Sequence, residues 1–133
     1  MAAILPNEGL VELMARGGGL TATAFTIIAT GSGNTAFTST SSELNTEITT
    51  VGLKRTTAAV TQEDGTFTDD TLQFVKAFTV TGDATVKEIG VTNKLTKDAD
   101  GEKWLYLEVL DTERTLVSGD TYTVTIKIIA ARV

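Results

Sequence analysis

The sequence predicts an all-β fold, an antiparallel β-sandwich or an open barrel of six to seven strands, preceded by a short N-terminal helix. About one residue in five is Thr, and these β-branched residues, which suit a half-exposed sheet face, are spread along the chain. Several segments alternate apolar and polar residues, with turn signals between them at fairly even spacing. Strand-like and helix-like segments do not alternate, which argues against a parallel sheet.

Residues 1–19 predict a helical arm that ends in a glycine hinge. Pro6 or Asn7 begins the helix, because Pro tolerates the first turn and Asn caps well, and the triple glycine 17–19 ends it, with Gly17 a candidate left-handed cap. Its apolar residues at helical spacing are Leu10, Leu13 and Met14. A helix this short is marginal alone in water and must pack on something. Two interpretations stay open, a cover for its own sheet or an arm that packs on a neighbouring subunit.

Residues 20–133 are predicted to form a single β-sandwich domain. The predicted strands are 21–30, 51–61, 71–80, 85–92, 103–110 and 121–131. In the predicted strand 85–92 the apolar residues change from an even position, Val86, to odd positions, Ile89 and Val91, which predicts a bulge near Glu88 or Gly90. Residues 43–48 are compatible with one helical turn, and residues 63–65 predict a hairpin turn with Gly65 in the special turn position.

The composition excludes several kinds of chemistry. The 133 residues include no His and no Cys, which rules out zinc fingers, haem ligation through His, iron–sulfur clusters, disulfides, Cys nucleophiles and Ser-His-Asp triads. The formal net charge of -6 argues against nucleic acid as a direct partner. No window is long and apolar enough for a membrane span, and the first residues lack the basic region of a signal peptide.

The remaining chemical motifs are weak. Gly31-Ser32-Gly33 lacks the third glycine and the βαβ context of a dinucleotide loop. The acidic segment 98–102 fails as an EF-hand, because the first and last ligand positions fall on Thr96 and Leu107. It predicts a hairpin turn, with an adventitious cation as the alternative. Carboxylate pairs for glycoside hydrolysis would need aromatic platforms, and only 6% of the residues are aromatic. We therefore expect no enzyme activity and no cofactor.

A series of short motifs in order along the chain resembles a group of small virion proteins of tailed bacteriophages. The motifs are Gly31 and Gly33, Leu44 with Glu47, Arg55, the segment 88–91, and the turn 119–121 before the closing segment 123–125. The resemblance implies a β-sandwich structural subunit present in many copies in the virion, which would be made in the host cytoplasm. It favours a capsid decoration, or cement, protein; a neck, tail or fibre-associated protein is the first alternative. A carbohydrate- or ligand-binding sandwich at a receptor-binding tip is the second.

The expected partners are the major capsid protein or another virion protein, and further copies of the chain as a homo-oligomer. No nucleic acid and no membrane are expected to bind. An acidic subunit suits basic patches on a capsid, where charge complementarity sets the register of docking. The candidate interface residues are Leu10, Leu13 and Met14 on the helix, with Trp104 and Tyr106 together on one face of a strand. Core packing is the alternative for each of them.

Overall fold

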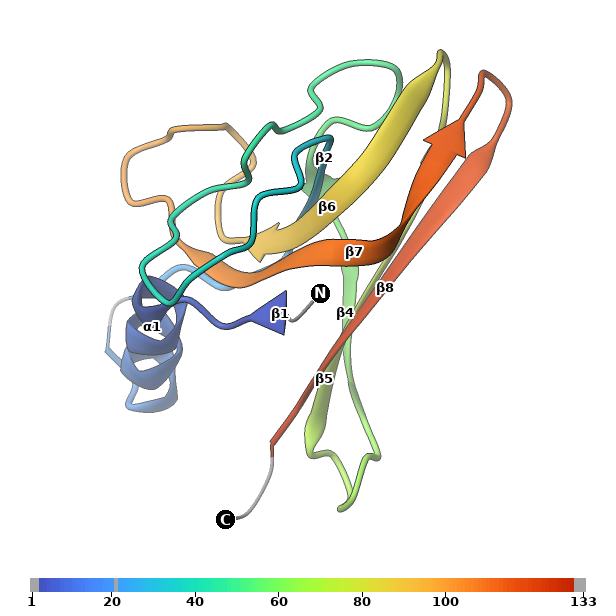
Figure 1. The fold of residues 1–133 in the computed structure, drawn as a ribbon. Helices are drawn as coiled ribbons and strands as arrows, with labels where there is room; N and C mark the ends of the chain where they lie inside the picture. Colours follow the sequence, from blue (N-terminus) through green and yellow to red (C-terminus); the bar gives the residue numbers. More distant parts are fainter. Residues whose placement is uncertain (1–2, 21, 131–133) are drawn as a thin grey trace.

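The computed structural model describes residues 3–20 and 22–130, which form two antiparallel β-sheets and one short helix (Figure 1). The fold class is the predicted all-β sandwich with an N-terminal helix. The elements are β1 (Ala3–Ile4), α1 (Asn7–Gly17), β2 (Ile27–Gly31), β3 (Thr56–Thr57), β4 (Ala59–Glu63), β5 (Thr71–Thr79), β6 (Ala84–Thr92), β7 (Trp104–Leu116) and β8 (Thr121–Ile129). The described residues thus contain more strands than predicted, because β1 and β3 have two residues each.

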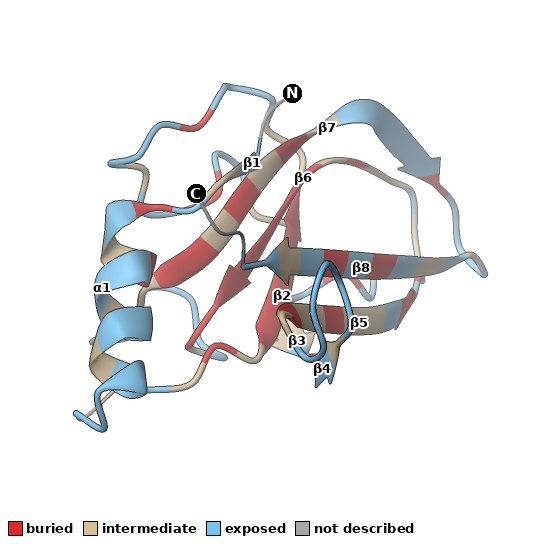
Figure 2. Cartoon of the chain, turned by 90° about the horizontal axis from the view of Figure 1, so that it is seen from below, coloured by how far each residue is buried: buried red, intermediate tan, exposed pale blue. Residues whose placement is uncertain are grey.

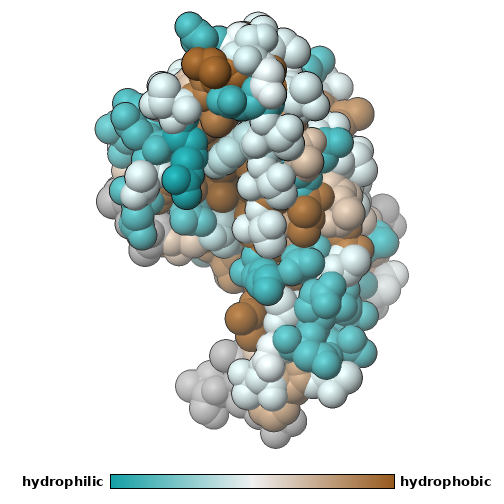
Figure 3. Space-filling model, turned by 90° about the vertical axis from the view of Figure 1, so that its right-hand side faces the viewer, coloured by the Kyte–Doolittle hydropathy of each residue, from teal (hydrophilic) through white to brown (hydrophobic). Residues whose placement is uncertain are grey.

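The two sheets differ in size and in strand order. Sheet A has five strands in the order β1-β7-β6-β2-β3, and sheet B has three in the order β4-β5-β8. The chain passes from sheet A to sheet B between β3 and β4, at Ala58, whose N–H donates to Thr26 O at 2.8 Å. The β4–β5 hairpin and the end of β8 project beyond the rest of the molecule (Figure 1), and this projecting end is the narrow lower part of Figure 3.

Apolar side chains pack on both faces of sheet A. The inner cluster lies between the two sheets and includes Ile28, Phe74 and Ile126. The outer cluster joins strand residues such as Leu107 to Phe37 and Leu44 of the long segment 32–55. All five residues of β2 are therefore buried, whereas β8 alternates between exposed and covered positions (Figure 2). Sheet A is the central layer of the molecule, and sheet B has one open face.

Four local predictions are wrong. Gly17 is the last residue of α1 and not a left-handed cap; the glycine with positive φ after the helix is Gly19, with φ 73°. The predicted strand 51–61 is divided into β3 and β4, because the chain changes sheets at Ala58. Residues 43–48 form no helical turn; Glu47 makes an isolated β-bridge with Gly31 instead. The β4–β5 hairpin is present, but the left-handed residue in its loop is Asp69, with φ 56°, rather than Gly65. The predicted end of the last strand, Ala131, lies outside the described residues.

The β6–β7 pair is irregular at two places. One register shift lies between Val86 and Glu88, which agrees with the predicted bulge near Glu88, and a second lies between Val91 and Thr92. At the second shift, Thr92 pairs with Trp104 and Val91 pairs with Tyr106, so β7 contains one extra residue. An extra residue reverses which side chains face which side of a sheet. Trp104 therefore joins the outer cluster, while Tyr106 packs against the inner one.

Candidate interaction surface

Helix α1 is held against the start of β7 by a close backbone contact. Gly9 is the buried residue of the helix, and a Cβ added to it would lie 2.1 Å from Trp104 O and 2.6 Å from Leu105 Cα. Only a residue without a side chain permits this approach, because a strand backbone cannot rotate away as a side chain can. Gly9 thus sets the distance between the helix and sheet A.

Glu8, next to this contact, completes the hydrogen bonding of β7. The Trp104 N–H donates to Glu8 Oε1 at 3.0 Å, and Lys103 Nζ lies 3.9 Å from Glu8 Oε2. Burial raises the pKa of the Glu8 carboxyl above its usual range, although the bond from Trp104 and the charge of Lys103 act in the opposite direction. The first turn of α1 therefore takes the place of a strand partner at this end of β7.

The predicted helix residues lie on the part of α1 that its own chain leaves uncovered. Met14 is 75% exposed and Val11 67%, while Leu10 and Leu13 are 39% and 38% exposed. Leu13 also borders an apolar groove of about 220 Å³ between α1 and the inner side of sheet B, where Val60 and Leu72 lie. The helix lies beside the start of β7, and many of its residues are exposed (Figure 2), among them these apolar ones.

The interface prediction is wrong for Trp104, which is fully buried. The bulge in β7 turns its side chain to the outer side of sheet A, where the Arg55 guanidinium lies 5.2 Å from the ring centroid. A Cβ added to Gly90 would lie 2.8 Å from the Trp104 ring. The indole N–H donates to Glu102 Oε1 at 3.0 Å. Trp104 is a core residue whose polar atom is satisfied.

Tyr106 is half-buried against the inner cluster and does not share a face with Trp104. Its hydroxyl donates to Glu108 Oε1 at 2.5 Å. Burial, together with this bond and the charge of Glu108, raises the pKa of Tyr106 well above its usual value. The tyrosine is therefore a neutral hydrogen-bond donor near the edge of sheet A.

Three buried charged side chains connect the segment 32–55 to the end of the β6–β7 pair. Arg55 donates to both Glu47 oxygens, at 2.8 Å from Nε and 2.5 Å from Nη2. Its Nη1 donates to Glu102 Oε2 at 2.8 Å and to Lys94 O at 3.1 Å. The Arg55 and Glu47 side chains are 1% and 2% exposed, and that of Glu102 is 9% exposed. This Arg55 cluster is a closed network, with the bidentate geometry that suits Arg and carboxylate.

The charge of Arg55 is maintained by its partners. Burial by itself would lower the pKa of Arg55, but the hydrogen bonds to Glu47 and Glu102 and their negative charges raise it above its ordinary value. The guanidinium ion and its two carboxylates consequently act as one unit. Removing Arg55 would leave the buried carboxylates of Glu47 and Glu102 without their cation.

A third buried carboxylate, Glu88, holds the first part of the same segment. Its two oxygens accept four hydrogen bonds, from the backbone N–H groups of Gly33, Asn45 and Thr46 at 3.2, 2.9 and 2.7 Å, and from Asn45 Nδ2 at 3.0 Å. Glu88 is fully buried. A Cβ added to Gly31 would lie 2.3 Å from Glu88 Oε2, so a glycine is needed beside this carboxylate. Glu88 thus orders a segment that forms no regular secondary structure.

These carboxylates are engaged in structural bonds rather than aimed into a cavity. Glu88 and the Arg55 cluster have their polar atoms satisfied, and within residues 3–20 and 22–130 no buried side-chain nitrogen or oxygen lacks a hydrogen-bond partner. In the same ranges, no three acidic side chains are grouped so as to hold a metal ion. In the acidic turn 98–102, Asp98 pairs with Lys97 at 3.0 Å, and its N–H donates to Glu102. The turn is a hairpin connection, as predicted.

Some of the motif residues that carry the resemblance, those within 31–55 and Glu88, lie together in space, whereas 119–121 and 123–125 lie at β8 of the other sheet. Gly31 and Gly33 contact Glu88, and Glu47 bonds Arg55. Leu44 is buried in the outer cluster between them. The order of these motifs in the sequence does not predict their contacts, which span up to 55 positions. The signal for Glu88 in the sequence is a charged residue in a predicted strand, whereas the Ser- and Thr-rich segment around Glu47 gives no comparable signal.

No protein-family model matches the chain, and no match was found among curated proteins or solved structures. The part of the chain that the structure describes contains no helix long and apolar enough to cross a membrane.

Proposed function

We propose that this protein is a structural subunit of a tailed-bacteriophage virion, a decoration protein that binds the capsid and braces its shell. The observation that carries the proposal is the exposed apolar side of α1, where Val11 and Met14 are 67% and 75% exposed. Contiguous apolar side chains exposed at a fixed position typically mark a protein–protein interface. Because Gly9 and Glu8 fix the helix on sheet A, this surface is preorganised for binding.

Two further observations support a role in binding rather than in catalysis. The buried charged groups stabilise a rigid domain, since the Arg55 cluster and Glu88 are closed networks of hydrogen bonds. The resemblance to small virion proteins rests on residues that build this same framework, including Gly31, Glu47 and Arg55. In this proposal the partner is the major capsid protein, further copies of the chain assemble on the shell, and the protein resides in the virion.

The carbohydrate-binding alternative loses its main candidate residue. A sugar-binding platform needs an accessible aromatic face, and Trp104 is fully buried. The neck or tail alternative uses the same kind of apolar surface as the decoration hypothesis. It differs in the partner, so binding to separated virion parts distinguishes the two.

The test is binding of the purified chain to capsids and to tails prepared without it, measured by co-sedimentation. We expect saturable binding to capsids that weakens at least tenfold in Val11→Glu, because a charge would be buried at the interface. Val117→Glu is the matched control, since Val117 is 51% exposed on the β7–β8 turn, away from α1. Binding to tails alone would contradict the decoration role. Equal capsid binding by the two variants would contradict the role of α1.

A further inference from the structure

The outer edge of β8 is a long strand edge that pairs with no other strand among the described residues. Within residues 3–20 and 22–130, β8 pairs with β5 alone, over nine positions from Thr121 to Ile129. The other edge strands are β1 and β3, with two residues each, and β4, with five residues ending in Glu63. Residues 109–116 of β7, which β1 does not cover, are also at an edge, but they include the charged residues Asp111, Glu113 and Arg114. Natural sheets protect their edges by short strands, charges or Pro. β8 has none of these protections except one charge, Lys127.

The hydrogen-bond pattern shows which backbone groups face the free edge. Val80 N–H donates to Asp120 O, and Ala130 N–H donates to Asp70 O, so the even-numbered residues of the last strand bond to β5. In an antiparallel ladder the intervening residues point their N–H and C=O groups to the other side. The groups of Thr121, Thr123, Thr125, Lys127 and Ile129 therefore lie along the free edge.

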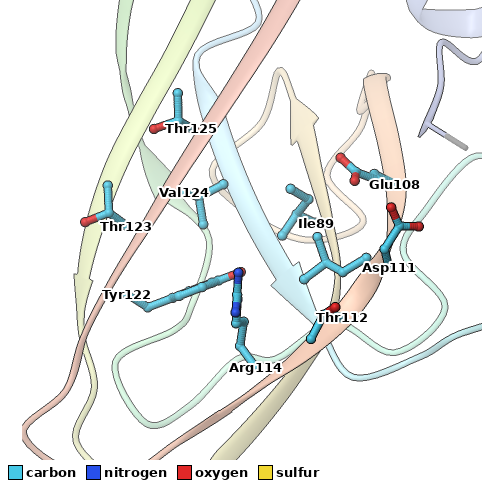
Figure 4. A pocket seen from close by; sticks show the side chains of 10 residues that line it. Ile89, Glu108, Asp111, Thr112, Arg114, Tyr122, Thr123, Val124 and Thr125 are labelled. Atoms are coloured by element: carbon cyan, nitrogen blue, oxygen red, sulfur yellow. The ribbon is translucent and has the colours of Figure 1, made fainter. Parts of the chain in front are cut away.

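A cleft beside this edge leaves it open to a partner. The cleft, of about 360 Å³, lies between β7 and β8, which are consecutive in the chain but not paired with each other. Val124 of β8 and Ile89 of β6 point into it, and Arg114 of β7 reaches toward Tyr122 (Figure 4). Thr123 and Thr125 border the cleft on the β8 side. An added strand would cover half-buried Leu110 on the opposite wall.

We propose that two copies of this chain pair through β8 about a two-fold axis at Thr125, which joins their B sheets into one continuous six-stranded sheet. In the register that pairs all nine residues, Thr125 lies opposite itself and Thr123 opposite Lys127. Each of the five residues whose backbone N–H and C=O face the free edge then lies opposite another of these five on the other copy, so all of them form backbone hydrogen bonds across the interface. A two-fold interface of this type is closed, so it yields a dimer rather than a filament.

The side chains of β8 are complementary to themselves in this register. On the inner face, half-buried Tyr122 lies opposite Ile128, and Val124 lies opposite Ile126, so every inner pair is apolar. Aromatic and β-branched residues are favourable cross-strand neighbours. The pairing would cover Tyr122 and Ile128, the two inner-face residues that one copy leaves partly exposed.

Charge also favours a second copy at this edge. Each chain has a formal net charge of -6, so most surfaces of two copies repel each other. β8 contains no acidic residue, and its single charge is Lys127. In the proposed register the two Lys127 residues are separated by four residue steps, about 14 Å at strand spacing, which exceeds the screening length at physiological salt. The edge is therefore a strip where two acidic chains can meet without repulsion.

The pairing goes beyond the proposed function, because it uses β8 and not α1, and the two are tested separately. The chain contains no cysteine, so a single introduced cysteine reports the register directly. In Thr125→Cys the two Cα atoms would be about 5.5 Å apart, within the range of a disulfide. In Thr123→Cys, on the same exposed face, they would be too far apart. We expect a disulfide-linked dimer under mild oxidation for the first variant and at least tenfold less for the second.

Sedimentation equilibrium tests the association without a cross-link. We expect the wild-type chain to reach twice its mass of 14.0 kDa. Thr125→Pro should raise the dissociation constant at least tenfold, because the two-fold axis removes the Thr125 N–H bond from both copies. Its N–H faces away from β5, so circular dichroism and the melting temperature measured on the monomer should stay close to wild type. Gln62→Pro, on the exposed strand β4, controls for an edge proline that leaves β8 unchanged, because the N–H of residue 62 also faces away from β5.

Three results would overturn the proposal. They are a wild-type monomer at high micromolar concentration, equal cross-linking of Thr123→Cys and Thr125→Cys, and a dimer that Thr125→Pro leaves intact. The first and third would exclude the β8 edge as a contact between copies, and the second would exclude the register. Capsid binding that persists in monomeric Thr125→Pro would leave the proposed function standing without this pairing.

Discussion

The segment 32–55 and helix α1 both pack against sheet A, but different physical means hold them in place. The segment is anchored by buried ions, because Glu88 accepts four hydrogen bonds and Arg55 joins two carboxylates. The helix is anchored by shape, through the close contact of Gly9 and one hydrogen bond to Glu8. A segment without regular structure needs many fixed backbone bonds, whereas a helix satisfies its own backbone and needs only a surface that fits.

The largest expected effect follows from removing the central ion of the first anchor. Arg55→Ala leaves Glu47 and Glu102 buried without their cation, and we expect a loss of about 3–5 kcal/mol in the free energy of unfolding, measured by urea denaturation. Lys87→Ala is the control, because its pair with Glu113 is exposed and spans 3.6 Å, and it should cost less than about 1 kcal/mol. Similar losses in the two variants would contradict the role of the buried network.

An intermediate loss of stability is expected from adding a methyl group at Gly9, where helix α1 contacts β7. In Gly9→Ala the new Cβ meets the β7 backbone, so the helix must shift or detach, at a cost of about 1–3 kcal/mol that the better helix propensity of Ala partly offsets. We expect hydrogen exchange of the Trp104 amide to accelerate at least tenfold, because its acceptor is Glu8.

Gly17→Ala provides the matched control in the same helix. A Cβ at Gly17 would meet nothing within 4 Å, so the Trp104 amide should keep its protection. Unchanged exchange in Gly9→Ala would show that the close contact does not hold the helix.

The smallest expected effect is the pH dependence of stability that comes from Glu8, which accepts the hydrogen bond from Trp104 N–H. The pKa of Glu8 in the folded protein is raised above the ordinary value of 4.5, so ionisation of this group costs the folded state stability. The stabilising contribution of Glu8 is complete at a pH below the pKa of this group in the unfolded chain. It is lost as the pH rises through the pKa of the group in the folded protein. A carboxylate whose pKa is lowered by a salt bridge shows the opposite dependence. Glu8→Gln keeps an oxygen that can accept from Trp104 and removes the titration.

The melting temperature of the wild type relative to Glu8→Gln should therefore fall as the pH rises above 4.5, by less than about 4 °C. Glu8→Ala, which also removes the acceptor, should be less stable than Glu8→Gln throughout this range. A wild-type melting temperature that rises with pH relative to that of Glu8→Gln would contradict the assigned direction.

The sequence alone predicts the regular elements well where one face of a strand is buried. β5 and β8 follow the alternation of residues 71–80 and 121–131, because burial of one face produces a period of two. The alternation fails at β2, where all five residues are buried, since the segment 32–55 covers the face that would otherwise meet solvent. It also fails at Ala58, where one predicted strand crosses between sheets.

The candidate site was predictable only in part. Leu10, Leu13 and Met14 were identifiable because helical spacing is local, and they are at least partly exposed. Trp104 was not, because one extra residue in β7 reverses its face, and the unbroken alternation of residues 103–110 gives no sign of this bulge. The contacts of Glu88 with residues 33–46 are long-range, and no local pattern encodes them.

By itself, the sequence determined the class of the fold, the short helix and the absence of His and Cys chemistry, because composition and residue period are local properties of the chain. The tertiary structure decided which charged residues are buried together, which face Trp104 takes and which strand edge stays open. These features depend on pairing between distant segments, and the energy of a buried charge or a free strand edge is defined only after the sheets have assembled.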